Sequence, residues 1–134
     1  MNYDEFVGQV QHRAHLADGG QAMRAIHATL ETLNERLVGG EADDLAAQLP
    51  TEIGSYLREP VLQEKFGFHE FFERVAVREE VPISDAAFHA SAVVSVLCNA
   101  VSRGEMEDVR SQLPKEYDRL FEVAQLSIMA NGRA

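Results

Sequence analysis

The sequence contains a single cysteine, Cys98, in 134 residues, which excludes a disulfide within the chain. No apolar run follows a basic N-terminal start, so we expect no secretory signal peptide. The longest apolar run, around residues 93–100, is interrupted by Ser95 and Asn99 and is too short to span a bilayer. These absences predict a cytoplasmic protein without a membrane segment.

Basic residues are also scarce. The 12 Lys and Arg residues are outnumbered by 22 Asp and Glu residues, for a net charge of −10, and residues 1–58 and 59–134 share this acidic excess equally. Binding to nucleic acid or to an anionic membrane needs clustered Lys and Arg. The charge therefore argues against nucleic-acid and membrane partners, and it is typical of a surface kept soluble by self-repulsion.

One motif does occur twice in the chain. Residues 40–52 and residues 104–116 both follow the pattern G-E-x-x-D-[LV]-x-x-Q-L-P-x-E. Apolar residues outside the motif recur at nearly the same offset of 64 (from Gly40 to Gly104). Self-similarity at a fixed spacing is the signature of an internal duplication.

The duplication predicts the domain organisation. We expect one domain over residues 1–134, with repeats at 1–58 and 67–128. The connection, residues 59–66, is not rich in Gly or Ser. Its apolar residues Val61, Leu62 and Phe66 predict that it packs against the domain rather than acting as a flexible linker.

Helical periodicity predicts the fold class. Apolar residues recur at helical spacing in almost every segment, so we predict an all-α domain of about eight helices. It would be a duplicated four-helix unit with pseudo-twofold symmetry, in which the second and sixth helices are central. The valine-rich stretch 90–101 has strand propensity. Its counterpart, residues 22–37, is rich in strong helix formers, so we predict a helix there too, buried on most sides.

Local signals place several helix ends. Asn2 and Glu5 have the spacing of a capping box, and Ser84 is expected to cap the sixth helix. Glu41 is expected to open a short third helix after Gly39-Gly40, since glycine readily adopts the conformation that ends a helix. The fourth helix of the second half is expected to continue through residues 123–128.

A family resemblance rests on three stretches: residues 1–6, residues 30–37 and the motif beginning at Gly40-Glu41. These resemble a small family of bacterial and archaeal proteins catalogued only as a domain of unknown function. Its members carry G-E-x-x-x-L-x-x-Q-L-P once in each of two tandem helical halves. In this chain the second half departs more, with Arg103, Met106 and Arg110 at family glycine and alanine positions. The resemblance implies an all-α fold and no particular activity.

The motif repeats a set of polar residues that are the candidate site positions. They are Glu41, Asp44, Gln48 and Glu52 in the first half, and Glu105, Asp108, Gln112 and Glu116 in the second. The spacing allows the first three residues of each set to share one helix face. We interpret them mainly as structural, with each glutamine amide bonding a free carbonyl where its own helix ends. The alternative is a paired polar site for a cation or for a partner's hydrogen-bond donors.

Other catalytic and metal-binding patterns are missing. The five histidines do not form a zinc ligand pattern with the single cysteine. We interpret His12 and His15 as a solvated helix face and Cys98 as a small buried hydrophobe. No phosphate-binding glycine loop and no G-x-S-x-G motif occurs. The sequence therefore predicts no catalytic residue, no metal ligand and no cofactor.

Two classes of function are consistent with these observations. The first is a non-enzymatic helical module for protein interaction or scaffolding, with an unknown protein partner or a second copy of the chain. The second is a protein or enzyme that binds a small molecule or a cation through the duplicated carboxylates between the halves. A buried, mutually close set of Glu41, Asp44, Glu105 and Asp108 would favour the second class, and an exposed apolar patch would favour the first.

Overall fold

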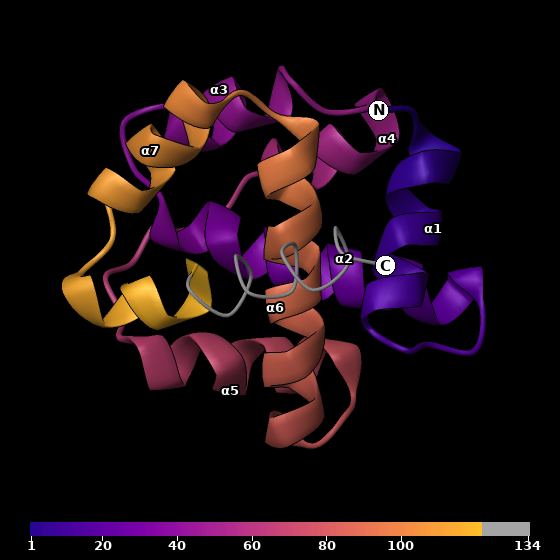
Figure 1. Ribbon diagram of the computed structural model, residues 1–134. Coiled ribbons are helices and arrows are strands. Elements are labelled where there is room, and N and C mark those ends of the chain that lie inside the picture. The colour runs from indigo at the N-terminus through magenta and orange to yellow at the C-terminus, as the bar shows by residue number, and fades with distance from the viewer. Residues whose placement is uncertain (122–134) are drawn as a thin grey trace.

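The computed structural model describes residues 1–121, which form one all-helical domain without a strand in that range (Figure 1). The elements in chain order are α1 (Tyr3–Arg13), α2 (Gly19–Arg36), α3 (Glu41–Ala46), α4 (Thr51–Gly54), η1 (Ser55–Leu57), α5 (Phe68–Glu79), α6 (Ile83–Ala100), α7 (Arg103–Ser111) and η2 (Lys115–Tyr117). The predicted all-α class is confirmed. The expected extension over residues 123–128 lies outside the described residues.

Helix α6 lies at the centre, as Figure 1 shows, with α2 crossing behind it. It packs against α1, α2 and α5, and the valine-rich stretch is helical as expected. By length and composition alone α6 could cross a membrane, so its apolar stretch is longer than the sequence suggested. However, 56% of that span is buried inside the fold, and a buried core helix meets the same criteria.

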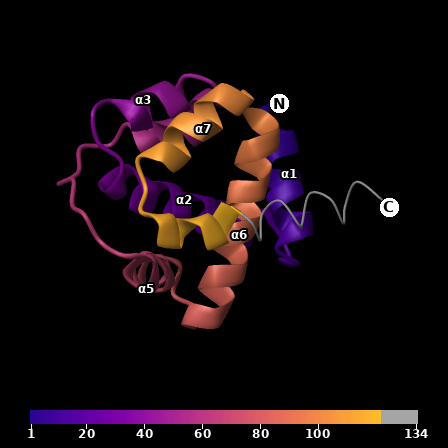
Figure 2. The same ribbon diagram turned by 60° about the vertical axis from the view of Figure 1, so that its left-hand side comes forward.

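Residues 1–57 form α1, α2, α3, α4 and η1, and residues 68–117 form α5, α6, α7 and η2, so the two orders are similar except that α4 has no α-helical counterpart in the second set. Helices α2 and α6 both have 18 residues, and each is followed by a short helix that begins near the repeated motif. The two short helices, α3 and α7, lie side by side at one end of the molecule (Figure 2). Residues of the two motif copies therefore face each other there.

Capping interactions fix several helix starts. Asn2 and Glu5 form the expected capping box at the start of α1. The expectation for Ser84 is wrong, because α6 begins one residue earlier, at Ile83, directly after Pro82. Proline suits this position because its missing N–H would have no partner in the first turn of a helix.

The connection between the halves packs down only in part. Phe66 is buried, but Leu62 is 84% exposed, so the expectation that Leu62 packs is wrong. The Phe66 carbonyl accepts hydrogen bonds from Arg36 Nε at 2.9 Å and from the Tyr117 hydroxyl at 2.8 Å. The backbone N–H of Glu64 also donates to the carbonyl of Glu35. These bonds hold the end of the connection and leave its middle in solvent.

Candidate metal centre between α3 and α7

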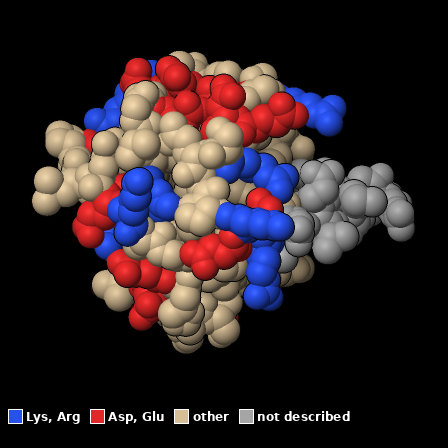
Figure 3. Space-filling view, turned by 90° about the vertical axis from the view of Figure 1, so that its left-hand side faces the viewer, with Lys and Arg blue, Asp and Glu red and all other residues tan. Residues whose placement is uncertain are grey.

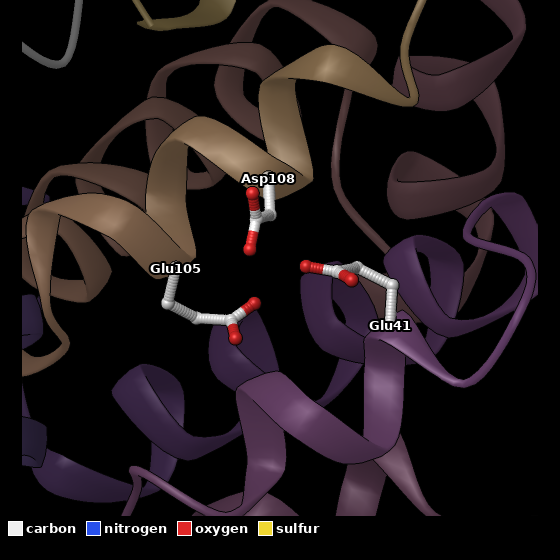
Figure 4. Close-up of side chains that lie close together, drawn as sticks. All are labelled: Glu41, Glu105 and Asp108. Carbon is white, nitrogen blue, oxygen red and sulfur yellow. The ribbon is translucent and has the colours of Figure 1, made fainter.

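Three of the eight repeated polar residues meet at the contact between α3 and α7. Glu41 comes from α3, and Glu105 and Asp108 come from α7. One carboxylate oxygen of each lies within 4.8 Å of one in the other two. Figure 4 shows the three carboxylates pointing toward one another from the two helices. Because Glu41 and Glu105 are equivalent positions of the motif, the two copies contribute the same residue to one place.

Local structure places each glutamate differently. Gly39 and Gly40 have φ values of 66° and 80°, a left-handed conformation that favours glycine, and α3 begins immediately after them at Glu41. In the second half the Ser102 hydroxyl caps α7 by accepting a hydrogen bond from the Glu105 backbone N–H at 3.2 Å. Because Ser102 caps the helix, α7 starts before Gly104 and is longer than α3. The pattern Ser102-x-x-Glu105 is a capping-box signal that our sequence analysis missed.

The three carboxylate residues of this cluster differ in solvent exposure. Glu41 and Glu105 are each only 9% exposed, whereas Asp108 is exposed. With both carboxylates ionised, Glu41 Oε1 and Glu105 Oε2 are buried and have no hydrogen-bond partner among the residues that the structure describes. A buried polar atom without a partner is unfavourable. The cluster is therefore open to solvent on the Asp108 side and unsatisfied on its buried side.

The electrostatics of the cluster raise the pKa of Glu105 from 4.5 to about 7. Burial is the largest cause, followed by a hydrogen bond between the Glu105 and Glu41 carboxyl groups, which needs a proton on one of them, and by the charges of Glu41, Asp44 and Asp108. Burial disfavours the charged carboxylate, and so do like charges nearby. None of the ion pairs within residues 1–121 includes a member of the cluster.

Nearby basic side chains pair with other acids. Arg58 pairs with Asp43, Arg103 with Glu107 and Arg110 with Asp118. Figure 3 shows acidic side chains gathered along the upper edge of the molecule, where α3 and α7 lie, with a mixture of acidic and basic side chains below. The surface around the cluster is therefore negative.

The repeated glutamines connect the two halves. The Ser102 backbone N–H donates to Gln48 Oε1 at 2.7 Å, and Gln48 Nε2 donates to the Ser102 hydroxyl at 3.3 Å. Gln112 forms two bonds with Val38, one from the backbone N–H to Oε1 and one from Nε2 to the carbonyl, both at 3.0 Å. Our expectation that each glutamine bonds the end of its own helix is wrong, because Gln48 reaches Ser102, directly before α7, and Gln112 reaches Val38, three residues before α3.

The remaining repeated acids lie outside the cluster. Asp44 is exposed and acts on Glu105 through its charge alone. Glu116 accepts the Phe68 backbone N–H at 3.0 Å and so caps α5. Glu52 is exposed, and within residues 1–121 its side chain takes part in no hydrogen bond or ion pair. The repeated positions thus divide into three groups: the carboxylate cluster, the acids outside it, and two glutamine clamps. The clamps are the paired hydrogen bonds of Gln48 with Ser102 and of Gln112 with Val38.

The cysteine and histidines lie elsewhere. His12 and His15 are exposed. Cys98 is only half-buried, and burial raises the pKa of its thiol. His89 forms a buried pair with Glu79, which the sequence did not signal because neither residue belongs to a motif. Burial is also the largest influence on Glu79 and raises its pKa.

Comparison with known proteins agrees with the family resemblance noted from the sequence. The chain matches the family described as "Uncharacterized conserved protein (DUF2267)" over residues 3–120. A search of curated proteins finds no match. Because the family match covers nearly the whole chain, this protein belongs to the uncharacterized conserved family DUF2267.

Proposed function

We propose that this domain is a non-enzymatic protein that binds a divalent cation between α3 and α7. The observation that carries the proposal is the meeting of Glu41 and Glu105, two carboxylates that are each 9% exposed, with buried oxygens that have no partner in residues 1–121. Two unit charges about 4 Å apart repel by roughly 4 kcal/mol at an effective dielectric constant of about 20. A cation between the carboxylates would turn this repulsion into attraction.

The chemistry of the donors supports a hard cation. All three candidate ligands are carboxylates, from Glu41, Glu105 and Asp108, and oxygen ligands suit Ca²⁺, Mg²⁺ and Mn²⁺ rather than zinc or copper. The oxygens lie within 4.8 Å of one another, and two oxygens on opposite sides of a Ca²⁺ ion are separated by about 4.8 Å. One ion can therefore contact all three carboxylates. Water would complete the coordination through the exposed Asp108 side.

We also propose that the two halves are copies of one unit. Support comes from the clamps, because Gln48 and Gln112 are equivalent positions and so are their partners Ser102 and Val38. In a twofold arrangement each contact between the halves occurs twice in opposite directions. A residue near the axis meets its own counterpart, as Glu41 meets Glu105. This arrangement accounts for a motif that is repeated in sequence and yields one shared site.

A binding titration tests the cation proposal. The full chain is stripped with a chelator, dialysed, and titrated calorimetrically at pH 8 with CaCl₂, MgCl₂ or MnCl₂ in turn. We expect one ion per chain and a higher melting temperature in the presence of the ion. Glu41→Gln, Glu105→Gln and Asp108→Asn should each weaken binding by about tenfold or more, since each removes a charged ligand.

Glu52→Gln is the matched control for these variants. It removes the same charge from a repeated acid that lies outside the cluster, so we expect its affinity to stay within about twofold of the wild type, because exposed and distant charges are screened by salt. Absence of binding and of a melting shift with all three ions would refute the proposal. Equal weakening by Glu52→Gln would attribute any binding to the net charge of the surface.

The interaction module that the sequence favoured is a second candidate. The observation in its favour is Phe88, which is 46% exposed at the edge of a shallow hollow lined by Phe68, Phe72 and Leu120. Exposed aromatic residues are enriched at protein interfaces. Light scattering of the wild type and of Phe88→Ser over a range of concentrations tests one form of this function, self-association. A wild type that is monomeric at every concentration would exclude that form.

A further inference from the structure

Helix α7 is attached to the rest of the described fold mainly through α3. Among elements of residues 1–121, α3 is the one with which α7 makes its main contact, whereas α3 also packs on α4 and η1. The contact combines two opposing sets of interactions. The carboxylates of Glu41, Glu105 and Asp108 repel across it, whereas the two glutamine clamps and buried apolar side chains hold it together.

Each glutamine clamp lies near the N-terminal end of one of the two short helices, α3 and α7. Gln112 holds Val38, three residues before α3 begins, and Gln48 holds Ser102, the residue that caps α7. All four clamp bonds involve exposed groups, so water competes for each bond and its net contribution to stability is modest. The attraction between the helices is therefore weak where water competes with it.

Both helices also bury apolar side chains in the hydrophobic core. Leu45 of α3 is 0% exposed, and Met106 and Val109 of α7 are 7% and 1% exposed. Separation of α3 and α7 would bring these side chains into contact with water. An open form would thus be recognisable both by exchange of its clamp amides and by a newly exposed apolar surface.

We infer that the divalent cation fastens α7 to α3, and that its removal opens this contact while the α2–α5–α6 core stays folded. The inference rests on the proposed cation site and adds what occupancy of that site controls. With the ion bound, Glu41 on one half and Glu105 with Asp108 on the other share a common positive charge. Without it, three carboxylates of like charge face each other across a contact held by exposed amide bonds and by apolar packing. The two forms differ by the closure of one helix pair.

Hydrogen exchange of the full chain, followed by mass spectrometry at pH 8, tests this inference. Exchange is measured after chelation and again after addition of CaCl₂ or MnCl₂. Without the ion we expect peptides that contain residues 38–46 and 102–111 to exchange about tenfold faster or more, because opening exposes their amides. Peptides from α2 and α6 should exchange at nearly the same rate with and without the ion. A dye that binds apolar surface should fluoresce more strongly without the ion.

The double variant Glu41→Gln/Glu105→Gln provides a control that still folds without the ion, since it removes the repulsion and retains side chains of the same size. Its α3 and α7 peptides should stay protected after chelation and should not respond to the ion. The variant Gln48→Ala/Gln112→Ala should open more than the wild type in the absence of the ion. Fast exchange of α3 and α7 in the Glu→Gln variant would show that repulsion does not open the contact, and would overturn the inference.

The remaining outcomes separate this inference from the cation proposal. Calorimetric binding with unchanged exchange in α3 and α7 overturns the inference and leaves the cation site standing. Equal slowing of exchange in α2, α6, α3 and α7 also overturns it, because that pattern is global stabilisation by a bound ligand. Absence of binding with every ion refutes the cation site itself.

Discussion

The side-chain amide of Gln112 bonds both backbone groups of Val38, 74 positions earlier in the chain. The counterpart Gln48 also forms two bonds, but one of them is to a hydroxyl, that of Ser102. A hydroxyl can accept or donate, whereas a carbonyl can only accept. The two clamps therefore differ in the substitutions that they tolerate.

This difference predicts unequal effects of Gln→Glu. Gln112→Glu places a carboxylate against the Val38 carbonyl, where a donor is needed, so we expect a loss of about 1–2 kcal/mol in the free energy of unfolding. Gln48→Glu can still accept from the Ser102 N–H and hydroxyl, so its loss should be about 0.5 kcal/mol or less. Urea denaturation measures both. Equal losses would show that the type of partner is unimportant.

The Gln→Ala variants serve as references for both sites. Each removes two bonds to exposed groups, so each should lose about 1 kcal/mol. The double variant should lose more than the sum if the clamps support one closed state, since groups in one network are not additive. Strict additivity would mean that the clamps act independently.

The raised pKa of Glu105 predicts how stability depends on pH in the chelated protein. The folded pKa of about 7 lies above the ordinary value of 4.5, so the folded state binds the proton more tightly than the unfolded state. The stability contribution is fully present below 4.5 and is lost as the pH rises through 7. Glu105→Gln should lack this loss, so the difference in stability between variant and wild type should grow between pH 4.5 and pH 8.

The difference between wild type and variant is the quantity to measure, because other groups titrate in the opposite sense. Burial acts to raise the pKa of Glu35, but hydrogen bonds from Arg78 and Arg74 outweigh it and give a net lowering. The stability contribution of Glu35 is therefore present above its unfolded pKa and is lost as the pH falls. A wild-type-minus-variant difference that stays flat from pH 4.5 to pH 8 would contradict the raised pKa of Glu105.

Two glycines should respond to alanine in opposite directions. A Cβ at Gly54 would lie 2.8 Å from the backbone oxygen of Ala46, so Gly54→Ala should destabilise the fold by about 1–3 kcal/mol. A Cβ at Gly8, on the exposed face of α1, meets nothing within 4 Å. Gly8→Ala should stabilise by about 0.5–1 kcal/mol because alanine favours the helix. Thermal melts of the two variants give the signs directly.

The hydroxyl of Tyr117 fastens the connection between the halves. It donates to the carbonyls of Phe66 at 2.8 Å and Gly67 at 3.1 Å, and burial raises the pKa of Tyr117 to about 12. Tyr117→Phe should lose about 1 kcal/mol and make cleavage near Leu62 by a protease faster. Tyr3→Phe is the control, since the Tyr3 hydroxyl has no hydrogen bond within the described part of the chain. Equal effects would exclude a specific role for the Tyr117 bond.

Much of the fold and part of the site follow from the sequence alone. Periodicity and capping signals are local, so they predicted the class, the helix α6 and the capping box at Asn2. The repeated motif also identified Glu41 and Glu105 as candidates. It could not predict that these residues meet, because spacing along one helix defines a face without defining what packs on that face. For the same reason the partners of Gln48 and Gln112 were assigned to their own helices.

Other features left no pattern in the sequence to detect. Leu62 is exposed because the middle of the connection, residues 59–66, runs through solvent. The neighbouring apolar residues Val61 and Phe66 had led us to expect that Leu62 packs. The buried pair of Glu79 and His89 joins α5 to α6, so it depends on the packing of two helices. Charged residues at such positions look like ordinary surface residues until the tertiary structure is known.

Because α6 is the most apolar helix, the order in which the ribosome synthesises the helices affects how long α6 stays without packing partners. Ribosomal synthesis delivers α1 and α2 before α6, and all of these helices contact one another in the fold. The most apolar helix thus emerges when part of its protein surroundings already exists, which shortens the time that it spends without a partner. A circular permutant that begins at α6 would reverse this order. We expect such a permutant to give a lower soluble yield than the natural order of the same helices.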